Sequence, residues 1–389
     1  MSNTRFDLII IGGGLAGASL AVALRDTRLR IALIESQAPT RPAGWDARIY
    51  AVSPANADFL ERIGAWKHLD PGRMAPIRSM DVVGDRGGRI EFSAYDTGVP
   101  ELGWILESSL MACEFWESLK RQSNVTLFCP ARPHALHWHA DTAELELDNG
   151  QRLSARLIVG ADGRDSWTRQ QAGLEAITTP YGEKGVVANF ATEKPHRHVA
   201  YQWFRDDGVL AYLPLPGNRM SIVWSTPDAH ADALCALPAD ELCQRVAAAG
   251  EHRLGRLECL TPAAAFPLRL IRVPRTVAPR LALLGDAAHG IHPLSGHGIN
   301  LGFQDVRVLA ELLAGAPNWQ DIGDERFLQR YQRARREEIV LMQGTTDRLR
   351  RLFRSPNALL GTLRNVGLSA TNQLPFIKNT LARYALGVL

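Results

Sequence analysis

The sequence predicts a mixed α/β fold: a Rossmann-like domain built on a parallel sheet, interleaved with a domain of antiparallel sheet, and a helical C-terminus. Three observations predict it. The chain opens on an apolar strand, a glycine turn, a helix and a second apolar strand. Its middle alternates polar and apolar residues between turn signals, and from Asp305 onward most of the chain has a helical pattern.

The composition is that of an ordinary globular protein. The 389 residues are 46% hydrophobic and 22% charged, which suits one large domain or two interleaved ones. The five cysteines are widely spaced and contain no Cys-x-x-Cys pair, which favours a reduced, cytoplasmic setting over a disulfide framework. The longest uncharged run, Leu8–Leu24, is too short and glycine-rich for a membrane span and lacks the basic leader of a signal peptide.

The N-terminal segment predicts a βαβ unit. An apolar strand at Phe6–Ile11 is followed by a helix at Leu15–Arg25 and a second strand at Ile31–Ile34. The turn between the first strand and the helix has the pattern G-x-G-x-x-G. This context makes the glycine motif far more specific than the motif alone.

The three glycines of this turn are Gly12, Gly14 and Gly17, and Glu35 ends the second strand. Small residues let backbone amides approach a pyrophosphate at the start of a helix. An acid at the end of the second strand accepts the ribose hydroxyls. The segment therefore predicts a dinucleotide-binding site.

The middle of the chain predicts antiparallel sheet at 74–98 and 186–226, with an Asn149-Gly150 hairpin turn and helices at Glu107–Gln122 and Ala239–Ala249. No low-complexity linker separates these segments, so the domains are expected to be interleaved. The expected divisions are 1–73, 99–174 and 268–330 for the nucleotide-binding domain, 74–98 and 175–267 for the antiparallel domain, and 331–389 for the C-terminal helices.

Two further motifs follow apolar strands. The segment "LIVGADGRDSWTRQQAG" places Asp162 and Gly163 directly after the first of these strands. The segment "LALLGDAAHGIHPLSGHGIN" places Asp286 after the other, and a long amphipathic helix is expected to start near Gly298.

In this order, the three motifs resemble those of the flavoprotein aromatic hydroxylases typified by para-hydroxybenzoate hydroxylase. The resemblance spans nearly the whole chain. Within that group the sequence is most similar to the ubiquinone-biosynthesis hydroxylases of the UbiH/UbiF/VisC type. The segments that carry this similarity are "GDAAHGIHPLSGHGINLGFQDV", "AYLPLPGNRMSIVWS", "AAFPLRLIRV" and "RNVGLSATNQLPFIKNTLARYALG".

The resemblance implies a tightly bound FAD whose ADP half lies on the N-terminal motif. It places Arg48 near the flavin and its phosphates, Asp286 on the ribityl chain, and the backbone amides at the predicted helix start near the pyrimidine ring. The positions that it assigns to the cofactor are Gly12, Gly14, Gly17, Glu35, Arg48, Asp162, Gly163, Asp286, Gly298, Ile299 and Asn300.

The resemblance also implies the chemistry. The flavin is reduced, reacts with O2 to form a flavin hydroperoxide and transfers one oxygen atom to an aromatic ring, so the protein supplies no nucleophile or metal. NAD(P)H is the expected electron donor, with a separate reductase as the alternative. Arg164 and Arg169 could bind nicotinamide phosphates or could be surface charges.

No catalytic residue is assigned with certainty. The candidates for the substrate site are His292, Pro293 and Tyr212, because a base or positive potential near a phenol would favour its phenolate. The predicted sheet also carries aromatic residues that could line the pocket or belong to the core. These are Trp203, Phe204, Tyr212 and Trp224.

The histidines do not predict a metal site. His289 and His292 are three residues apart in a segment interrupted by Gly290 and Pro293, which does not match the helical spacing of zinc enzymes. His297 stands where the relatives usually have glutamine and could tune the flavin potential or point away from it. A second group could share one strand face but belongs to a peripheral strand; it comprises His137, His139 and Asp141.

Charge is distributed unevenly. Residues 330–389 hold eleven Lys or Arg and three acids, a net charge of +8, whereas the whole chain is +3. A basic tail on an acidic body predicts an anionic partner, either membrane lipid or an acidic protein. The alternative is that these are solvated helix faces that pack on the FAD domain.

Taken together, the sequence predicts an FAD-dependent monooxygenase that hydroxylates the aromatic ring of a polyprenylated phenol or quinol in ubiquinone biosynthesis. Two alternatives stay open: a hydroxylase of a small soluble phenol, and a non-catalytic flavin-binding assembly subunit. We expect a cytoplasmic protein without a nucleic-acid partner. Peripheral docking at the inner face of the membrane, or contact with other ubiquinone-biosynthesis proteins, is left open.

Overall fold

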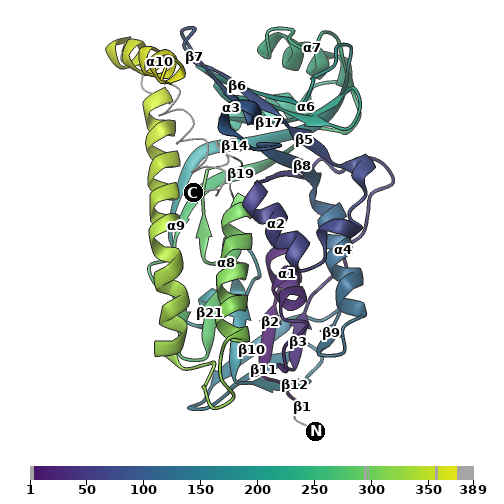
Figure 1. The fold of residues 1–389 in the computed structure, drawn as a ribbon, viewed down its shortest axis with the longest axis vertical. Helices are drawn as coiled ribbons and strands as arrows, with labels where there is room; N and C mark the ends of the chain where they lie inside the picture. Colours follow the sequence, from purple (N-terminus) through teal and green to yellow (C-terminus); the bar gives the residue numbers. More distant parts are fainter. Residues whose placement is uncertain (1–3, 293–295, 297, 355–357, 375–389) are drawn as a thin grey trace.

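The computed structural model describes residues 4–292, 296, 298–354 and 358–374. It has the predicted mixed α/β architecture, with a parallel sheet near one end and a large, mostly antiparallel sheet near the other (Figure 1). Helices of the parallel-sheet domain lie between the two ends, and the C-terminal helices run along one side (Figure 1). None of the described helices is long and apolar enough to cross a membrane.

The parallel sheet has six strands, of which only the edge strand β20 is antiparallel to its neighbour. Four of its strands are fully buried, which explains their continuous apolar sequences. In order across the sheet, the strands are β20 (Val277–Ala278), β21 (Leu281–Leu283), β13 (Leu157–Gly160), β2 (Leu8–Ile11), β3 (Ile31–Ile34) and β9 (Val125–Phe128).

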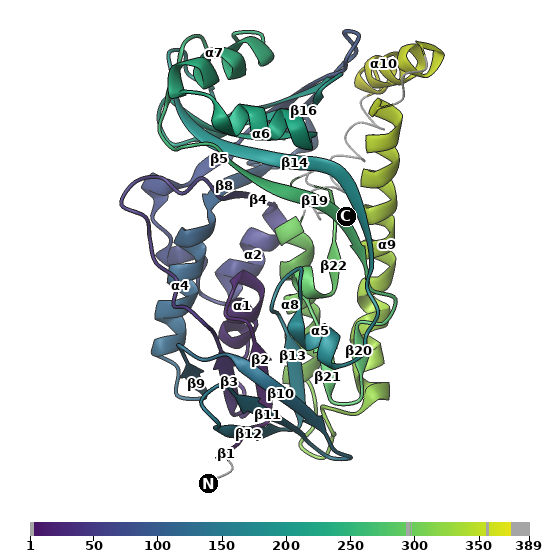
Figure 2. The ribbon, with the colours of Figure 1, turned by 180° about the vertical axis from the view of Figure 1, so that it is seen from behind.

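One face of this sheet is covered by helices and the other by a small sheet. That small sheet lies at the end of the molecule opposite the large sheet (Figure 2). Its strands, in order, are β1 (Thr4–Arg5), β12 (Arg152–Ala155), β11 (Ala143–Leu147) and β10 (Pro133–Trp138). The predicted hairpin turn joins β11 to β12, and Gly150 adopts the positive φ of +80° that such a turn requires.

The helices are as follows: α1 (Leu15–Ala23), α2 (Pro54–Arg62), α3 (Ala94–Thr97), α4 (Ser108–Lys120), α5 (Trp167–Gln171), α6 (Asp228–Ala236), α7 (Ala239–Ala249), α8 (Gly298–Ala314), α9 (Glu325–Arg354) and α10 (Ala358–Asn372), with short 3-10 turns η1 (Trp66–His68), η2 (Pro71–Arg73) and η3 (Gly285–Ala287). The helices α1, α4 and α7 correspond to those predicted from the sequence, and each lies within its predicted range.

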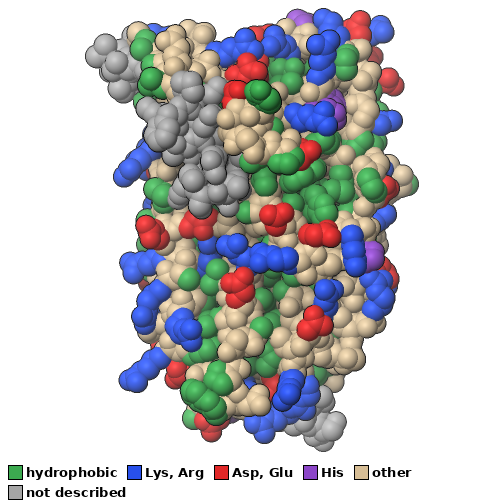
Figure 3. All heavy atoms as spheres, viewed as in Figure 1, with side chains coloured by type: hydrophobic (Ala, Val, Ile, Leu, Met, Phe, Trp, Pro, Cys, Tyr) green, Lys and Arg blue, Asp and Glu red, His purple; other side chains and the backbone are tan. Residues whose placement is uncertain are grey.

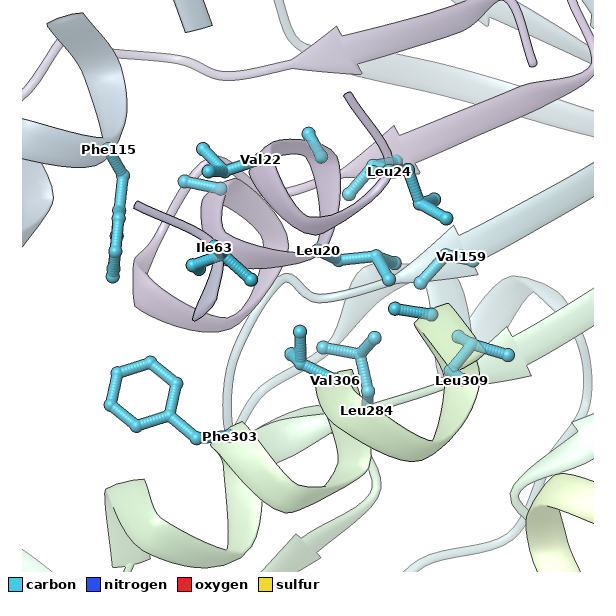
Figure 4. Packing of buried hydrophobic residues seen from close by; sticks show 14 of the residues in the cluster. Leu20, Val22, Leu24, Ile63, Phe115, Val159, Leu284, Phe303, Val306 and Leu309 are labelled. Atoms are coloured by element: carbon cyan, nitrogen blue, oxygen red, sulfur yellow. The ribbon is translucent and has the colours of Figure 1, made fainter. Parts of the chain in front are cut away.

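The core of the parallel-sheet domain lies where α1, α4 and α8 meet the sheet. Phe303 of α8 is fully buried, and its ring contacts the rings of Phe59 and Phe115 at centroid distances of 6.3 Å (Figure 4). Leu20 of α1 and Val159 of β13 belong to the same cluster and have no exposed surface. This core fixes the start of α8 relative to the carboxyl ends of the strands.

The large sheet has nine strands. Across the sheet they are β22 (His289–Gly290), β19 (Ala264–Arg272), β14 (Ile177–Thr192), β17 (Arg219–Pro227), β16 (Gly208–Leu215), β15 (Val199–Arg205), β6 (Ser79–Val83) and β7 (Arg89–Ser93), with β18 (Leu257–Cys259) paired to β14. The pair β15–β6 is parallel, so this sheet is mixed rather than wholly antiparallel. A fourth sheet, of three strands, lies beside it and consists of β4 (Ile49–Val52), β8 (Gly103–Glu107) and β5 (Ala75–Ile77).

The two faces of the large sheet differ. The helices α6 and α7 cover one face and form a core with its apolar side chains (Figure 2). The other face is turned toward the parallel-sheet domain: Asn189 donates a hydrogen bond to the carbonyl of Asp46 at 2.9 Å, and Leu213 packs against β4. Which side chains occupy which face follows from strand alternation.

The C-terminal helices tie the two ends together. The long helix α9 runs alongside α8 toward the large sheet, where α10 lies against β7 (Figures 1 and 2). The Tyr331 hydroxyl on α9 donates to the Leu283 carbonyl at 2.9 Å, and Phe353 stacks on Phe204 with ring centroids 3.7 Å apart. On α10, the Asn365 side chain accepts from the Gly88 amide at 2.9 Å.

Candidate active site

The three sequence motifs meet because their strands are neighbours. Gly160, at the end of β13, pairs with both Ile11 of β2 and Leu283 of β21. The backbone pairing continues beyond it, with the Ala161 amide bonded to the Ile11 carbonyl at 2.8 Å and the Leu284 amide bonded to the Gly160 carbonyl at 3.0 Å. The segments that follow these strands therefore share one edge of the sheet, where ligands bind in such folds.

The glycines of the first motif have different roles. A Cβ atom on Gly12, whose φ is +104°, would lie 2.5 Å from the carbonyl oxygen of Ala161, and one on Gly17 would lie 1.9 Å from the carbonyl oxygen of Gly12. These two positions allow the strand and helix to touch. A Cβ atom on Gly14 would meet no atom within 4 Å, so this glycine borders open space.

The start of α1 is suited to an anion. Gly14 precedes the helix and offers no side-chain cap, and the first turn contains no acid. The amides of this turn and the positive end of the helix dipole therefore remain available to a pyrophosphate. Glu35 lies beside the same turn, where its Oε2 accepts a 2.7 Å hydrogen bond from the Gly13 amide.

A polar cluster joins the predicted Arg48 and Asp286. Arg48 and Tyr50 are two residues apart at the start of β4, and the Arg48 Nε donates to the Tyr50 hydroxyl at 2.9 Å. Asp286 pairs with Arg164 at 3.0 Å. Tyr50 is the main cause of a raised pKa at Arg48, and the Asp286 charge adds to it. The guanidinium therefore stays charged beside the predicted ribityl site.

Sequence reasoning missed Tyr50. Its spacing of two from Arg48 was the available signal, because alternate residues of a strand share a face. Burial raises the pKa of this tyrosine, with the nearby Asp286 adding to the effect, so its hydroxyl remains a protonated donor.

Two residues of the second motif have structural roles. The Asp162 carboxylate accepts from the Ser166 hydroxyl at 2.5 Å and from the Thr168 amide at 2.8 Å, so it holds the turn that begins α5. Arg169 is only 6% exposed and donates to the carbonyl oxygens of Ala287 and Arg164. It joins the second motif to the third, which corrects its interpretation as a nicotinamide ligand or a surface charge.

The start of α8 is held by its own side chains. Asn300 is 4% exposed; its Oδ1 accepts from the Ser53 amide and from Asn56, both at 2.9 Å, and its amide donates to the Ala51 carbonyl at 2.8 Å. The Asn300 side chain is therefore used within the protein. The backbone at Gly298 borders open space, and the first turn of α8 contains no acid.

The histidines before α8 bind buried carboxylates. His289 lies 2.6 Å from Asp305, which also accepts from Arg335 at 2.7 Å and from the Gly285 amide at 3.0 Å. Asp305 is completely buried, and although burial opposes its ionisation, His289 and Arg335 lower its pKa.

His292 lies 3.0 Å from Glu183 and is 1% exposed, so it does not reach a substrate surface, and its proposed contact with substrate is corrected. Pro293 and His297 lie outside the described residues. The two histidines bind different carboxylates, and the described residues contain no group of three His, Cys, Asp or Glu placed to hold a metal. His137, on β10, belongs to the peripheral sheet as expected.

Of the two interpretations left open for the aromatic residues of the sheet, the structure supports the core. Tyr212 is 2% exposed, and its hydroxyl donates to the Val246 carbonyl on α7 at 2.6 Å. Trp203 and Trp224 lie in the same core under α6 and α7, and Phe204 is buried against α9. Trp203, Tyr212 and Trp224 share the face that α6 and α7 cover, whereas Phe204, the next residue along β15, lies on the opposite face.

The opposite face carries smaller side chains. Val187, Val223, Ala211 and Gln202 are cross-strand neighbours on four adjacent strands and form a row on the face turned toward the parallel-sheet domain. All but Val187 are partly exposed. We call these four residues the sheet row; it is mainly apolar and leads toward Phe204 and α9.

The comparisons with known proteins agree with this geometry. A family model described as an FAD binding domain matches residues 131–342, more than half of the chain, and a second FAD binding domain model matches residues 7–44. The chain therefore belongs to the FAD-binding monooxygenases typified by para-hydroxybenzoate hydroxylase. It is an FAD-dependent aromatic hydroxylase.

Individual relatives are similar over the full length. The chain is 37% identical to ubiquinone hydroxylase UbiL of Rhodospirillum rubrum, covering 98% of this chain and 90% of the relative. It is 33% identical to 3-demethoxyubiquinol 3-hydroxylase of Escherichia coli, covering both chains completely. Its fold is similar to that of p-nitrophenol 4-monooxygenase PnpA of Pseudomonas putida, with a TM-score of 0.81, 17% identity and 99% of both chains covered.

The first motif generates a prediction that separates binding from folding. Replacing Gly14 with Ala places a methyl group in open space at the start of α1, so the protein should fold normally but bind FAD about tenfold or more weakly. Flavin fluorescence titration of the apoprotein measures this affinity.

The control is Gly17→Ala, whose methyl group would clash with the backbone of Gly12. This variant should lower the thermal stability of the apoprotein itself. Equal FAD affinity in Gly14→Ala and the unaltered protein would contradict the placement of the pyrophosphate.

Proposed function

We propose that this protein hydroxylates the aromatic ring of a polyprenylated phenol or quinol in ubiquinone biosynthesis. The observation that carries the proposal is the sheet row. Val187, Val223 and Ala211 offer apolar surface facing the flavin domain, without a charged side chain in the row to bind the carboxylate of a small phenolic acid. The full-length similarity to two ubiquinone-pathway hydroxylases supports the same substrate class.

We assign the FAD contacts as follows. The amides at the start of α1 bind the pyrophosphate, and Glu35 accepts the ribose hydroxyls. Asp286 binds the ribityl chain, while Arg48 and Tyr50 lie beside it as a fixed cation and a protonated donor. Bound FAD supplies the reaction with O2 and the transfer of one oxygen atom.

The start of α8 contributes electrostatics. Its free amides and the positive end of the helix dipole stabilise negative charge at the pyrimidine edge of the flavin. The bonds from Asn300 to Ser53 and Ala51 hold these amides in place, so little reorganisation accompanies the change in charge. The sheet row places the ring and helps to exclude water.

The proposed electron donor is NAD(P)H. Arg164 lies at the edge of the site, is partly exposed and is held by Asp286, so it could reach a nicotinamide nucleotide while that nucleotide is bound transiently. Reduction of the bound flavin by a separate reductase is the alternative. Stopped-flow reduction of the flavin by NADH and by NADPH distinguishes the two.

We also propose that α9 docks on an anionic bilayer, which would give access to a prenylated substrate. Residues spaced by three or four along α9 form one outward stripe. We call it the arginine stripe; it comprises Arg326, Arg330, Arg333, Arg348 and Arg351, with Val340 and Leu341 at its centre. Basic side chains gather along this edge of the molecule (Figure 3).

The composition of the stripe favours lipid. Val340 and Leu341 are 60% and 47% exposed, and arginines flank them on both sides. Glu337 is the one acid of α9 that is exposed rather than half-buried or buried, and the structure describes this helix throughout. Apolar residues between cations match an interface where acyl chains lie beneath anionic headgroups.

The substrate class predicts a specific genetic outcome. Deletion of the gene, in a host without a redundant hydroxylase, should make a prenylated intermediate that lacks one ring hydroxyl accumulate, as detected by mass spectrometry of quinone extracts. Complementation with the unaltered gene should restore the profile, whereas the Gly14→Ala variant should restore it less well. An unchanged quinone profile after deletion would contradict the proposal.

The sheet row predicts a steric effect on catalysis. Ala211→Phe fills the centre of the row, so kcat/KM for the prenylated quinol should fall by about tenfold or more, equivalent to at least about 1.4 kcal/mol of transition-state stabilisation. FAD binding should not change. The control, Ala314→Phe, makes the same substitution at the exposed far end of α8 and should leave kcat/KM unaltered. A normal kcat/KM in Ala211→Phe would remove the row from the substrate site.

The arginine stripe predicts salt-sensitive vesicle binding. The double variant Arg330→Glu/Arg333→Glu should lose binding to vesicles that contain phosphatidylglycerol, because each lost cation costs about 1 kcal/mol near such a surface. Sedimentation at low and high salt measures it. The control, Arg245→Glu/Arg256→Glu, changes the net charge equally at exposed sites away from α9 and should bind normally. Equal loss of vesicle binding in both double variants would show that binding depends on net charge alone and not on the arginine stripe.

A further inference from the structure

Glu183 is a buried carboxylate that the proposed flavin contacts and the sheet row do not use. It lies on β14, where the pairing with β19 shifts register between Pro180 and Glu183, and it is 4% exposed. Gly182, directly before it, has a φ of +66°. A bulge of this kind re-aims the side chain that follows it.

Three parts of the protein meet at this carboxylate. Its Oε2 lies 3.0 Å from the Nε2 atom of His292, and its Oε1 accepts from Arg350 of α9 at 2.9 Å. Arg354, one turn further along α9, also pairs with it. Arg350 in turn donates to the Tyr181 carbonyl at 2.9 Å and lies over the Tyr181 ring at 4.3 Å.

The charges determine how this cluster is protonated. Burial opposes ionisation of Glu183, but the hydrogen bonds from His292 and Arg350 outweigh it and lower its pKa to about 2. Burial lowers the pKa of His292, and the two arginines add to this effect, so that together they outweigh Glu183, which raises it. A neutral imidazole therefore donates Nε2–H to the carboxylate, which fixes both the ring orientation and the tautomer.

The position of His292 makes this bond important for the flavin. The chain from Gly285 to Asn300 begins at the end of β21 and ends in the first turn of α8. It is held at Gly285 and His289 by Asp305 and at its far end by Asn300. Between these points, His292 is bound by the carboxylate of Glu183, which belongs to strand β14 of the large sheet.

We propose that Glu183 is a positioning residue: through His292 it sets the chain after Asp286, the residue assigned to the flavin, relative to the large sheet and α9. It contacts neither flavin nor substrate. Its negative charge keeps Arg350 and Arg354 of α9 against the sheet. The same carboxylate binds the His292 ring. The distance between the flavin and the sheet row therefore depends on this one carboxylate.

The test uses the flavin as its own reporter. Glu183→Gln keeps the shape but removes the charge, so Arg350 and Arg354 lose their shared counterion. At saturating FAD, the visible absorption and circular dichroism of the bound flavin should change and its midpoint potential should shift, while FAD affinity should fall by about fivefold. A merely structural role would lower the melting temperature and leave the spectrum and potential unaltered.

Asp81→Asn is the matched control. Asp81 on β6 is also 4% exposed and is also held by two arginines, Arg89 at 2.7 Å and Arg253 at 3.0 Å, but it lies toward the other edge of the sheet. This variant should lose thermal stability without altering the flavin spectrum or potential. A change of equal size in both variants would show a general loss of sheet stability and overturn the proposal.

Two further variants guard against misfolding of Glu183→Gln. Arg354 is 45% exposed, so Arg354→Gln should fold and shift the flavin potential in the same direction by a smaller amount. Glu183→Asp, which keeps the charge, should restore part of the native spectrum. A native spectrum and potential in both Glu183→Gln and Arg354→Gln would overturn the proposal.

The inference rests on the proposed flavin contact at the start of α8 but not on the identity of the substrate. If FAD does not occupy the assigned site, the Gly14→Ala variant also binds it normally. If the site is right and only the role of Glu183 is wrong, Gly14→Ala weakens binding while Glu183→Gln leaves the flavin unchanged.

Discussion

The site depends on the backbone pairing of one strand. Gly160 lies between Ile11 and Leu283 in a parallel sheet, and parallel strands that pair in register end at the same edge. Three motifs that are far apart in the sequence therefore converge on one edge of the sheet. A slip of one residue in this register would exchange the two faces of β13 and separate the turns. The glycines, the helix starts and the polar cluster at Asp286 all derive their positions from this pairing.

The need to satisfy two buried carboxylates explains the long helix α9. Asp305 and Glu183 are almost inaccessible to water, and an unpaired charge at such a depth would be strongly destabilising. Arg335 and Arg350 of α9 supply the partners. They are separated by fifteen residues, or about 22 Å of helix, so one continuous helix reaches from the flavin domain to the bulge of the substrate sheet. The inward face of α9 carries these arginines. The outward face carries the arginine stripe that we propose docks on the bilayer.

Much of the fold could be predicted from local sequence patterns. The βαβ unit, α1, α4 and α7 follow from periodicity and turn residues, and the flavin motifs follow from their spacing. The sequence also placed Tyr212 and Trp224 on the predicted sheet, but it left open whether they line the pocket or belong to the core. The direction in which these side chains point depends on which face of the sheet the helices cover. The free energy gained by burying the rings under α6 and α7 outweighs any local conformational preference of the strands. Arg169 was misread for the same reason, since only the folded chain brings the Ala287 carbonyl to it.

By itself the sequence determined the fold class, the cofactor and the positions of its binding motifs, because glycine turns, apolar strands and helix starts act over a few residues. Only the tertiary structure decided that His289 and His292 are each held by a buried carboxylate and that the sheet turns a row of small apolar residues toward the flavin domain. These outcomes depend on burial and charge pairing between segments up to 109 residues apart. Such pairing has no periodicity in the sequence that a local pattern could reveal.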